Sequence, residues 1–248
     1  MTKIEAYRQA LAQTADWDAY LRRESGLPGP RGNLELAEAA ADLGEPERLQ
    51  RYAALTPEQA PENTPDVFLA FCGVLGLGRL AAEGRFAALA ELRRHAADPR
   101  WRIREAVAMA LQRYGDRDME ALLREMERWA TGTPLEQRAA VAALCEPRLL
   151  RQEAHAEQVL RLLDGITASL ASASDRSGEP FKVLRQGLAY GWSVAVAALP
   201  RAGKPLMERW FASPDKDVRW LMRENLRKNR LARLDPAWVA HWRAELGA

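Results

Sequence analysis

Apolar residues recur at helical spacing along most of the chain. Ile103, Val107, Ala110 and Leu111 lie three or four positions apart with charged residues between them, so they share one face of an α-helix. Residues 159–166 repeat the pattern. No segment alternates apolar and polar residues as a half-buried β-strand does. The pattern therefore predicts an all-α protein.

The expected helix starts share one form, a small polar or acidic residue followed by proline. The first residue can cap free amides and the proline suits the first helical position. The six pairs are Thr64-Pro65, Asp98-Pro99, Thr133-Pro134, Glu179-Pro180, Ser213-Pro214 and Asp235-Pro236. Glycines that follow apolar stretches are expected to end helices: Gly84, Gly115, Gly132 and Gly203. These signals predict helices near residues 3–22, 34–42, 45–54, 66–82, 85–96, 99–114, 117–131, 134–145, 154–173, 180–198, 204–212, 216–228 and 235–246.

An internal repeat appears when residues 98–107 are aligned with residues 213–222. Proline, a branched aliphatic residue and arginine coincide, the arginines being Arg104 and Arg219, and Arg138 holds the same position in a third copy. This pattern resembles HEAT repeats, in which paired antiparallel helices stack into a curved solenoid. The resemblance covers residues 66–246 and implies an α-solenoid over 66–248. Residues 1–65 are expected to be helical without the repeat and to continue it as one domain.

The repeated arginines favour a structural role. Arg104 and Arg138 are expected to pair with carboxylates or helix-end carbonyls at the joints between repeats, because stacked repeats need satisfied joints.

Composition adds a charge asymmetry to this picture. The 248 residues are 48% hydrophobic and 28% charged, as in folded domains. The formal net charge is only +2. However, residues 1–50 hold 6 basic and 9 acidic side chains, whereas residues 201–248 hold 11 basic and 6 acidic ones. The C-terminal fifth is therefore locally basic, which suits an anionic partner.

Metal, cofactor and membrane chemistry find no support in the sequence. Cys72 and Cys145 are isolated, so both are expected to be buried thiols in a reducing cytosol. The three histidines, His95, His155 and His241, are widely separated and suggest no metal site. The longest apolar run, residues 68–78, is shorter than the roughly 20 residues that cross a bilayer. We expect a cytoplasmic protein with no metal, cofactor or membrane contact.

Two motifs imitate catalytic or phosphate-binding elements. Residues 191–195, Gly-Trp-Ser-Val-Ala, resemble a nucleophile elbow, which requires a preceding strand. Gly73, Gly76 and Gly78 lack the spacing of a phosphate-binding loop. The sequence favours a core helix for the first motif and close helix packing for the glycines.

The basic residues supply the leading functional hypothesis. Arg219, Arg223 and Arg227 are four positions apart, so they line one helical face, and Lys228 and Arg230 extend the charge. Arg100 and Arg102 belong to a second group near an expected inter-helix turn. These residues are candidates for binding an unknown protein or nucleic acid. The leading hypothesis is a non-enzymatic interaction module that binds its partner on the concave face of the solenoid or on the C-terminal basic face.

Four tryptophans lie near the C-terminal basic residues in sequence: Trp210, Trp220, Trp238 and Trp242. Aromatic faces can stack on bases while neighbouring cations hold phosphates. The alternative is that the tryptophans fill the core of the last hairpins.

A second resemblance suggests an enzyme. Residues 220–224, Trp-Leu-Met-Arg-Glu, followed by Lys228-Asn229, resemble the tryptophan-bearing helix of the bacterial HEAT-like alkylpurine DNA glycosylases. That family places a catalytic aspartate four residues after a tryptophan, where this chain has Glu105 after Trp101. The resemblance implies, as the alternative function, removal of alkylated bases at a site shaped by Trp101, Trp220 and Glu105.

Overall fold

The computed structural model describes residues 1–247 and confirms the all-α class. Its described part consists of α-helices and one short 3-10 turn, with no β-strand. The chain divides into two compact units, unit 1 comprising residues 1–117 and unit 2 the residues from 118 onward. The boundary expected at residue 65 falls inside unit 1, at the start of its longest helix.

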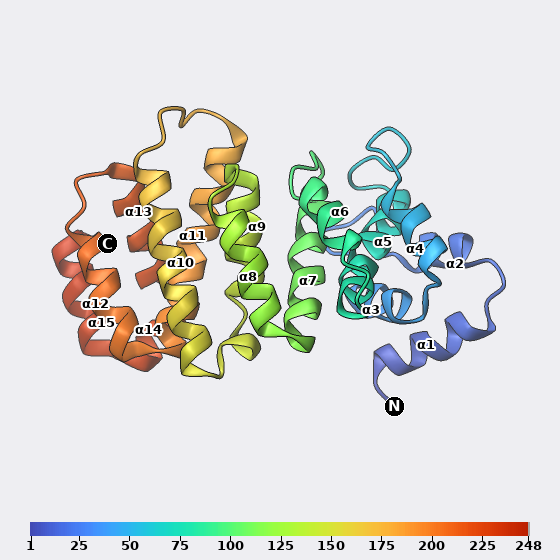
Figure 1. Ribbon diagram of the computed structural model, residues 1–248, viewed down its shortest axis with the longest axis horizontal. Helices are drawn as coiled ribbons and strands as arrows, with labels where there is room; N and C mark the ends of the chain where they lie inside the picture. The colour runs from blue at the N-terminus through green and yellow to red at the C-terminus, as the bar shows by residue number, and fades with distance from the viewer. Residues whose placement is uncertain (248) are drawn as a thin grey trace. The chain divides into compact units, whose positions relative to one another are not determined.

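Unit 1 is organised around one buried helix. Its helices are α1 (Lys3–Gln13), α2 (Trp17–Glu24), α3 (Leu34–Leu43), α4 (Pro46–Ala53), α5 (Pro65–Ala82), α6 (Ala87–His95) and α7 (Trp101–Arg117). Helix α5 contacts α2, α3, α4, α6 and α7, as Figure 1 shows. It is apolar on all sides, which is typical of a helix enclosed by others.

The glycines of α5 permit this enclosure. A Cβ atom on Gly73 would lie 2.3 Å from the backbone nitrogen of Ala53, and one on Gly78 would lie 2.2 Å from the carbonyl oxygen of Ala110. Gly76 faces Leu49 at similarly short range. Only residues without side chains let α4 and α7 approach α5 so closely, so the close-packing interpretation is confirmed.

Helix α5 is also the one helix in the described part of the chain that is long and apolar enough to span a membrane by length and composition. In the structure 78% of that segment is buried inside the protein.

Unit 2 is a stack of helical hairpins. Its helices are α8 (Met119–Ala130), α9 (Pro134–Leu144), α10 (Glu153–Ala171), α11 (Glu179–Ala198), α12 (Pro200–Phe211), α13 (Lys216–Leu226), α14 (Asn229–Leu234) and α15 (Pro236–Leu246), with a 3-10 turn at Pro147–Leu150. Consecutive helices pair, and α9, α11 and α13 form one layer while α8, α10 and α12 form the other. Each hairpin therefore buries its apolar face against its neighbours, as in repeat proteins.

Several predicted helix ends are confirmed by their caps. Thr133 forms a capping box with Glu136, and the Asp235 carboxylate accepts a hydrogen bond from the Trp238 amide at 3.0 Å. Gly84 has a positive φ of 90° directly after the α5 C-cap. Residues that are neighbours in sequence determine these boundaries, so the sequence was sufficient to predict them.

Other boundaries were wrong. The helix expected over residues 3–22 is two helices, because the chain leaves helical geometry after Gln13 and the Asp16 side chain caps a new start at the Ala19 amide. Helix α13 begins at Lys216, as the predicted range 216–228 has it, but its cap is Asp215, whose carboxylate accepts from two amides, and not Ser213. Gly115 lies inside α7 and Gly203 inside α12, so neither ends a helix.

Candidate functional site

A pocket of about 230 Å³ lies within unit 1. Helix α7 contributes Trp101, Glu105 and Met109, which are four residues apart and share one face. Helix α5 contributes Phe68 and Phe71, whose rings are parallel to within 1° with centroids 6.5 Å apart. Residues of the loop between α2 and α3 and of the α3 start complete the wall: Leu27, Pro30, Arg31, Gly32 and Leu34. The result is a mostly apolar, aromatic cavity with one carboxylate.

The loop wall is fixed by hydrogen bonds at both ends. The Ser25 hydroxyl accepts a hydrogen bond from the backbone N–H of Leu27 at 3.1 Å. The backbone N–H of Asn33 donates to the Ser25 carbonyl at 2.8 Å. At its centre, the Gly29 amide donates to the Asn63 side chain at 3.2 Å. The loop is therefore held in place by the protein without any ligand.

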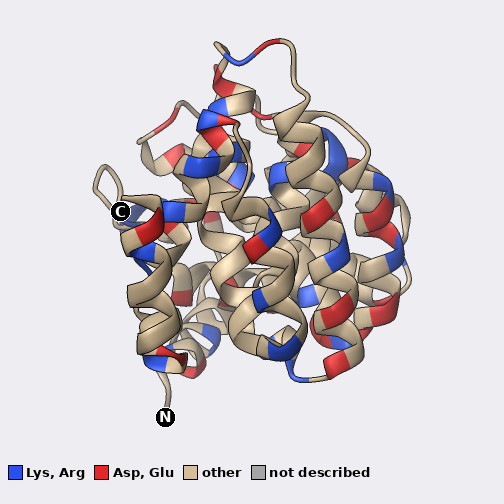
Figure 2. Cartoon of the chain, turned by 90° about the vertical axis from the view of Figure 1, so that its left-hand side faces the viewer, with Lys and Arg blue, Asp and Glu red and all other residues tan. Residues whose placement is uncertain are grey.

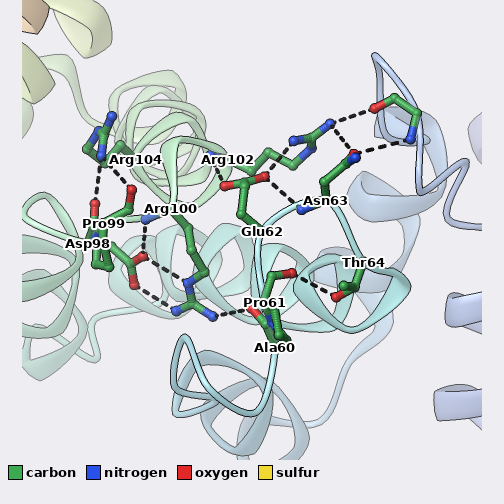
Figure 3. A network of polar contacts seen from close by, with 11 residues as sticks. Ala60, Pro61, Glu62, Asn63, Thr64, Asp98, Pro99, Arg100, Arg102 and Arg104 are labelled. Carbon is green, nitrogen blue, oxygen red and sulfur yellow. Dashed lines mark hydrogen bonds and ion pairs between the residues drawn. The ribbon is translucent and has the colours of Figure 1, made fainter.

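Arg102 is a structural residue of this wall. Its guanidinium donates to the Gly29 carbonyl at 2.7 Å and forms an ion pair with Glu62, and it stacks on the Trp101 ring at 4.4 Å. Figure 3 shows this network. Only 7% of Arg102 is exposed. The expectation that Arg102 contacts a nucleic acid or protein partner is therefore corrected: its donors and its surface are used inside unit 1.

Arg100 requires the same correction. It is 4% exposed, holds both carboxylate oxygens of Asp98 at 2.7 and 2.9 Å, and donates to the Ala60 carbonyl at 3.1 Å. This pair fastens the start of α7 to the segment before α5 (Figure 3). An arginine next to an acidic cap is used locally, which the Asp98-Pro99-Arg100 sequence itself could have signalled.

Arg104 lies where the repeat pattern predicted a structural residue. Its guanidinium donates to the carbonyls of Asp98 and Pro99 at 2.9 and 3.1 Å, in the turn that precedes its own helix. Both carbonyls belong to the turn between α6 and α7, so Arg104 has the expected structural role, with turn carbonyls in place of helix-end ones. Arg138 lies on α9, with its side chain against Gly187 of α11.

In unit 2 the predicted basic residues lie on α13, at its end and on α14. We call Arg219, Arg223, Lys228 and Arg230 the basic cluster. Within the described chain, none of the four has a carboxylate within ion-pair distance, whereas Arg227 pairs with Glu224. Figure 2 looks onto the side where α12, α14 and α15 lie in Figure 1 and shows basic and acidic segments interspersed. The positive charge is thus a local feature and not a uniform face.

An aromatic side chain accompanies the basic cluster. Tyr190 of α11 is 46% exposed. The Arg230 guanidinium lies 4.6 Å and the Lys228 ammonium 5.9 Å from its ring centroid. Sequence reasoning missed Tyr190, because it is some forty residues from these cations and α14 reaches it only through tertiary packing on α11.

The four C-terminal tryptophans are half-buried and make their contacts within unit 2. Trp210 and Trp238 donate their indole N–H groups to Asp164 at 2.8 Å and Glu208 at 2.7 Å, and Trp242 packs on Phe211 with centroids 4.7 Å apart. Trp220 is half-buried beneath the Arg185 guanidinium, 4.3 Å from its ring. Trp220 belongs to unit 2, whereas Trp101 and Glu105 line a pocket within unit 1.

The nucleophile-elbow motif is a core helix, as expected. Ser193 is fully buried within α11, and its hydroxyl donates to the Tyr190 carbonyl at 2.7 Å. The Ser193 amide donates to the Asn225 side chain at 2.8 Å, and that side chain donates to the Leu188 carbonyl at 2.9 Å. Asn225 therefore fastens α13 to α11 through hydrogen bonds to the α11 backbone.

The two thiols are buried, as predicted. Burial raises the pKa of Cys145 to about 12, so the thiolate that would react or bind metal is disfavoured. Among the described residues, no three His, Cys, Asp or Glu side chains form a group that could hold a metal ion.

Comparisons with known proteins identify no family. No family model matches the chain, and no curated protein matches it. Two solved structures resemble it. One is an engineered protein from a structural genomics consortium, at 16% identity over 94% of this chain and 98% of that one, with a TM-score of 0.37. The other is a designed armadillo repeat protein, at 14% identity over 83% and 98% of the two chains, with a TM-score of 0.30. At these scores the fold description rests on the helices themselves, and the HEAT and glycosylase resemblances stay predictions.

Proposed function

We propose that this protein is a non-enzymatic interaction module that binds nucleic acid through the basic cluster and Tyr190 of unit 2. One observation carries the proposal: four cations that have no carboxylate partner among the described residues lie on α13, on α14 and between them, two of them around an exposed aromatic ring. Buried or neutralised cations stabilise the fold, but uncommitted ones retain their charge for a ligand.

The chemistry of the cluster suits nucleic acid. Guanidinium and ammonium groups neutralise phosphates and release counterions. An aromatic ring among them offers a surface on which an unpaired base can stack. A stretch of acidic protein would use the cations but gain less from the ring.

The test is binding of labelled single-stranded DNA, duplex DNA and RNA, measured by fluorescence anisotropy across a salt series. Affinity is expected to fall with salt. The variant Arg219→Ala/Arg223→Ala should reduce the log–log slope for duplex DNA by about 1.8, at about 0.9 per lost phosphate contact. Tyr190→Leu should weaken single-strand binding with little change in the slope.

A matched control removes the same charge elsewhere in unit 2. Arg128 and Arg209 are 72% and 64% exposed and pair with Glu125 and Asp164. Arg128→Ala/Arg209→Ala should leave the slope close to that of the wild type. If the wild-type protein has no affinity for any of the three nucleic acids at low salt, the proposal fails and a protein partner becomes the better candidate.

A second candidate function, removal of alkylated bases, is supported by one observation. Trp101 and Glu105 line the same unit 1 pocket, so an aromatic face and a carboxylate adjoin one cavity. The test is release of free base from alkylated duplex DNA. Glu105→Gln should abolish release while binding persists, and absence of release by the wild-type protein would remove this candidate.

A further inference from the structure

We infer that the unit 1 pocket binds a neutral, apolar small molecule about the size of one substituted benzene ring. This inference requires neither of the functions proposed above, because the ligand is free and is not part of a nucleic acid. It rests on three properties of the pocket: the size of the cavity, the apolar surface that its walls leave uncovered, and the engagement of its buried charges within the protein.

The size of the cavity limits the ligand. The cavity measures about 230 Å³. An apolar protein cavity of about 150 Å³ accepts benzene, and drug-sized ligands occupy pockets of roughly 300–1,000 Å³. One ring with a short alkyl substituent lies between these limits.

The walls leave apolar surface uncovered. Phe68 and Phe71 line the cavity from α5 and are buried. Trp101, which also lines it, is 47% exposed, and the lining side chains of Leu34 and Met109 are half-buried. Single exposed apolar residues are ordinary, but apolar side chains gathered around a concavity mark a ligand site. An apolar ligand would remove its own surface and that of the walls from water together.

The shape of the cavity does not depend on a ligand. Hydrogen bonds made by the backbone N–H groups of Leu27 and Gly29 hold the loop of residues 25–33. The Arg102 guanidinium ties the same loop to the start of α7 through the Gly29 carbonyl. Because the walls are already ordered, binding avoids the entropy loss that ordering a loop would add.

The charged side chains at the pocket favour a neutral ligand over an ionic one. Arg102 is buried and pairs with Glu62, and Glu105 also has an interaction partner within the protein. Arg31 is exposed on the loop, where water solvates it. An ionic substituent would lose hydration in this apolar cavity, and the buried charges around it are already engaged, so its burial is costly. A neutral ligand avoids that loss.

Three compounds with one ring and different charge test the inference: toluene, benzylamine and benzoate. Titration of the full chain by calorimetry, without nucleic acid, should show saturable binding of toluene. Benzylamine and benzoate should each bind at least about tenfold more weakly, because each ion must be desolvated. Either ion binding as tightly as toluene, or no saturable binding of toluene up to its solubility, would overturn the inference.

Two variants locate the site from different helices. Leu34→Trp on α3 and Met109→Trp on α7 each place an indole in the cavity and should lower toluene affinity by at least about tenfold. Leu43→Trp is the matched control, because Leu43 ends the same helix as Leu34, is 40% exposed and does not line this pocket. It should bind toluene as the wild type does.

Circular dichroism establishes which variants are folded, and either of the two cavity variants suffices if the other does not fold. Unchanged toluene affinity in a folded cavity variant would contradict the inference, as would an equal loss in Leu43→Trp. The unit 2 variant Arg219→Ala/Arg223→Ala should bind toluene normally, so failure here and failure of nucleic-acid binding are separate results.

Discussion

The two units solve the same packing problem in different ways. Unit 1 encloses one apolar helix, α5, whose glycines allow backbone-to-backbone contact with α4 and α7. Unit 2 repeats helical hairpins in two layers, and each long helix keeps one exposed side. Enclosure leaves little surface but creates a pocket where α5, α7 and a loop meet. The stacked hairpins of unit 2 leave an exposed side on which the cations of the basic cluster have no carboxylate partner in the described chain.

The largest effect that would test this difference is loss of the polar bridge in unit 2. Asn225→Leu leaves the Ser193 amide and the Leu188 carbonyl without their partner in a fully buried site. The variant loses three buried hydrogen bonds of the Asn225 side chain, and at about 0.5–1.5 kcal/mol for each the free energy of unfolding should fall by roughly 1.5–4.5 kcal/mol. Denaturant unfolding measures it. Asn229→Ala, at an exposed position on α14, is the control, and equal effects of the two changes would refute the bridging role.

A smaller effect compares glycines in the two units. In Gly78→Ala the new Cβ meets the Ala110 backbone, which cannot rotate away, so overpacking should cost about 1–3 kcal/mol. In Gly165→Ala on α10 the new Cβ meets nothing within 4 Å, and the better helix propensity should add about 0.5–1 kcal/mol. Thermal or denaturant unfolding of the two variants should thus give opposite signs. Stabilisation of Gly78→Ala would show that α7 can move away from α5.

These elements also show what sequence reasoning can reach. Apolar spacing predicted the helices, and capping chemistry predicted the ends at Thr133 and Asp235, because both depend on neighbours in sequence. The break at Asp16 is a local cap that the sequence analysis missed, whereas the helices continue through Gly115 and Gly203, so a glycine alone does not end a helix.

The candidate sites likewise contain some residues that are neighbours in sequence and others that only the fold brings together. Trp101 and Glu105 could be paired from sequence because they lie one helical turn apart. The pocket that they line also needs Phe68, Phe71 and Leu27, which only the fold brings together. Arg102 was misjudged because its partner Glu62 lies about forty residues away, whereas Arg100 is held by Asp98, which is only two residues away and could have been recognised.

A pH series tests a three-helix junction of unit 1. Asp42 of α3 pairs with Arg8 of α1 and Arg113 of α7. Burial alone would raise the pKa of Asp42, but the two guanidinium groups hold it below its ordinary value. The ionised carboxylate therefore stabilises the fold above the unfolded-state pKa of about 3.9, and that contribution is lost as the pH falls through the lower folded-state value. Asp42→Asn should be less stable than the wild type at pH 6, with the difference narrowing below about pH 4. A difference that stays constant down to pH 2.5 would contradict the pairing.

The smallest expected effect separates committed from uncommitted arginines within unit 2. Arg176 of the turn before α11 donates to Asp215 at 2.6 Å and to the buried Asp217 at 3.0 Å, as well as to the Ala173 carbonyl at 3.1 Å. Arg219 and Arg223 have no such carboxylate partner in the described chain. Replacing either one by alanine should therefore change the free energy of unfolding by no more than about 0.5 kcal/mol. Arg176→Ala should lower it by more, because it removes one of the two cations that hold Asp217, the other being Arg185. Chemical unfolding of the three single variants measures the contrast. If Arg219→Ala or Arg223→Ala lowered the free energy of unfolding as much as Arg176→Ala, the basic cluster would be stabilising the fold. Its charge could then no longer explain binding of a partner.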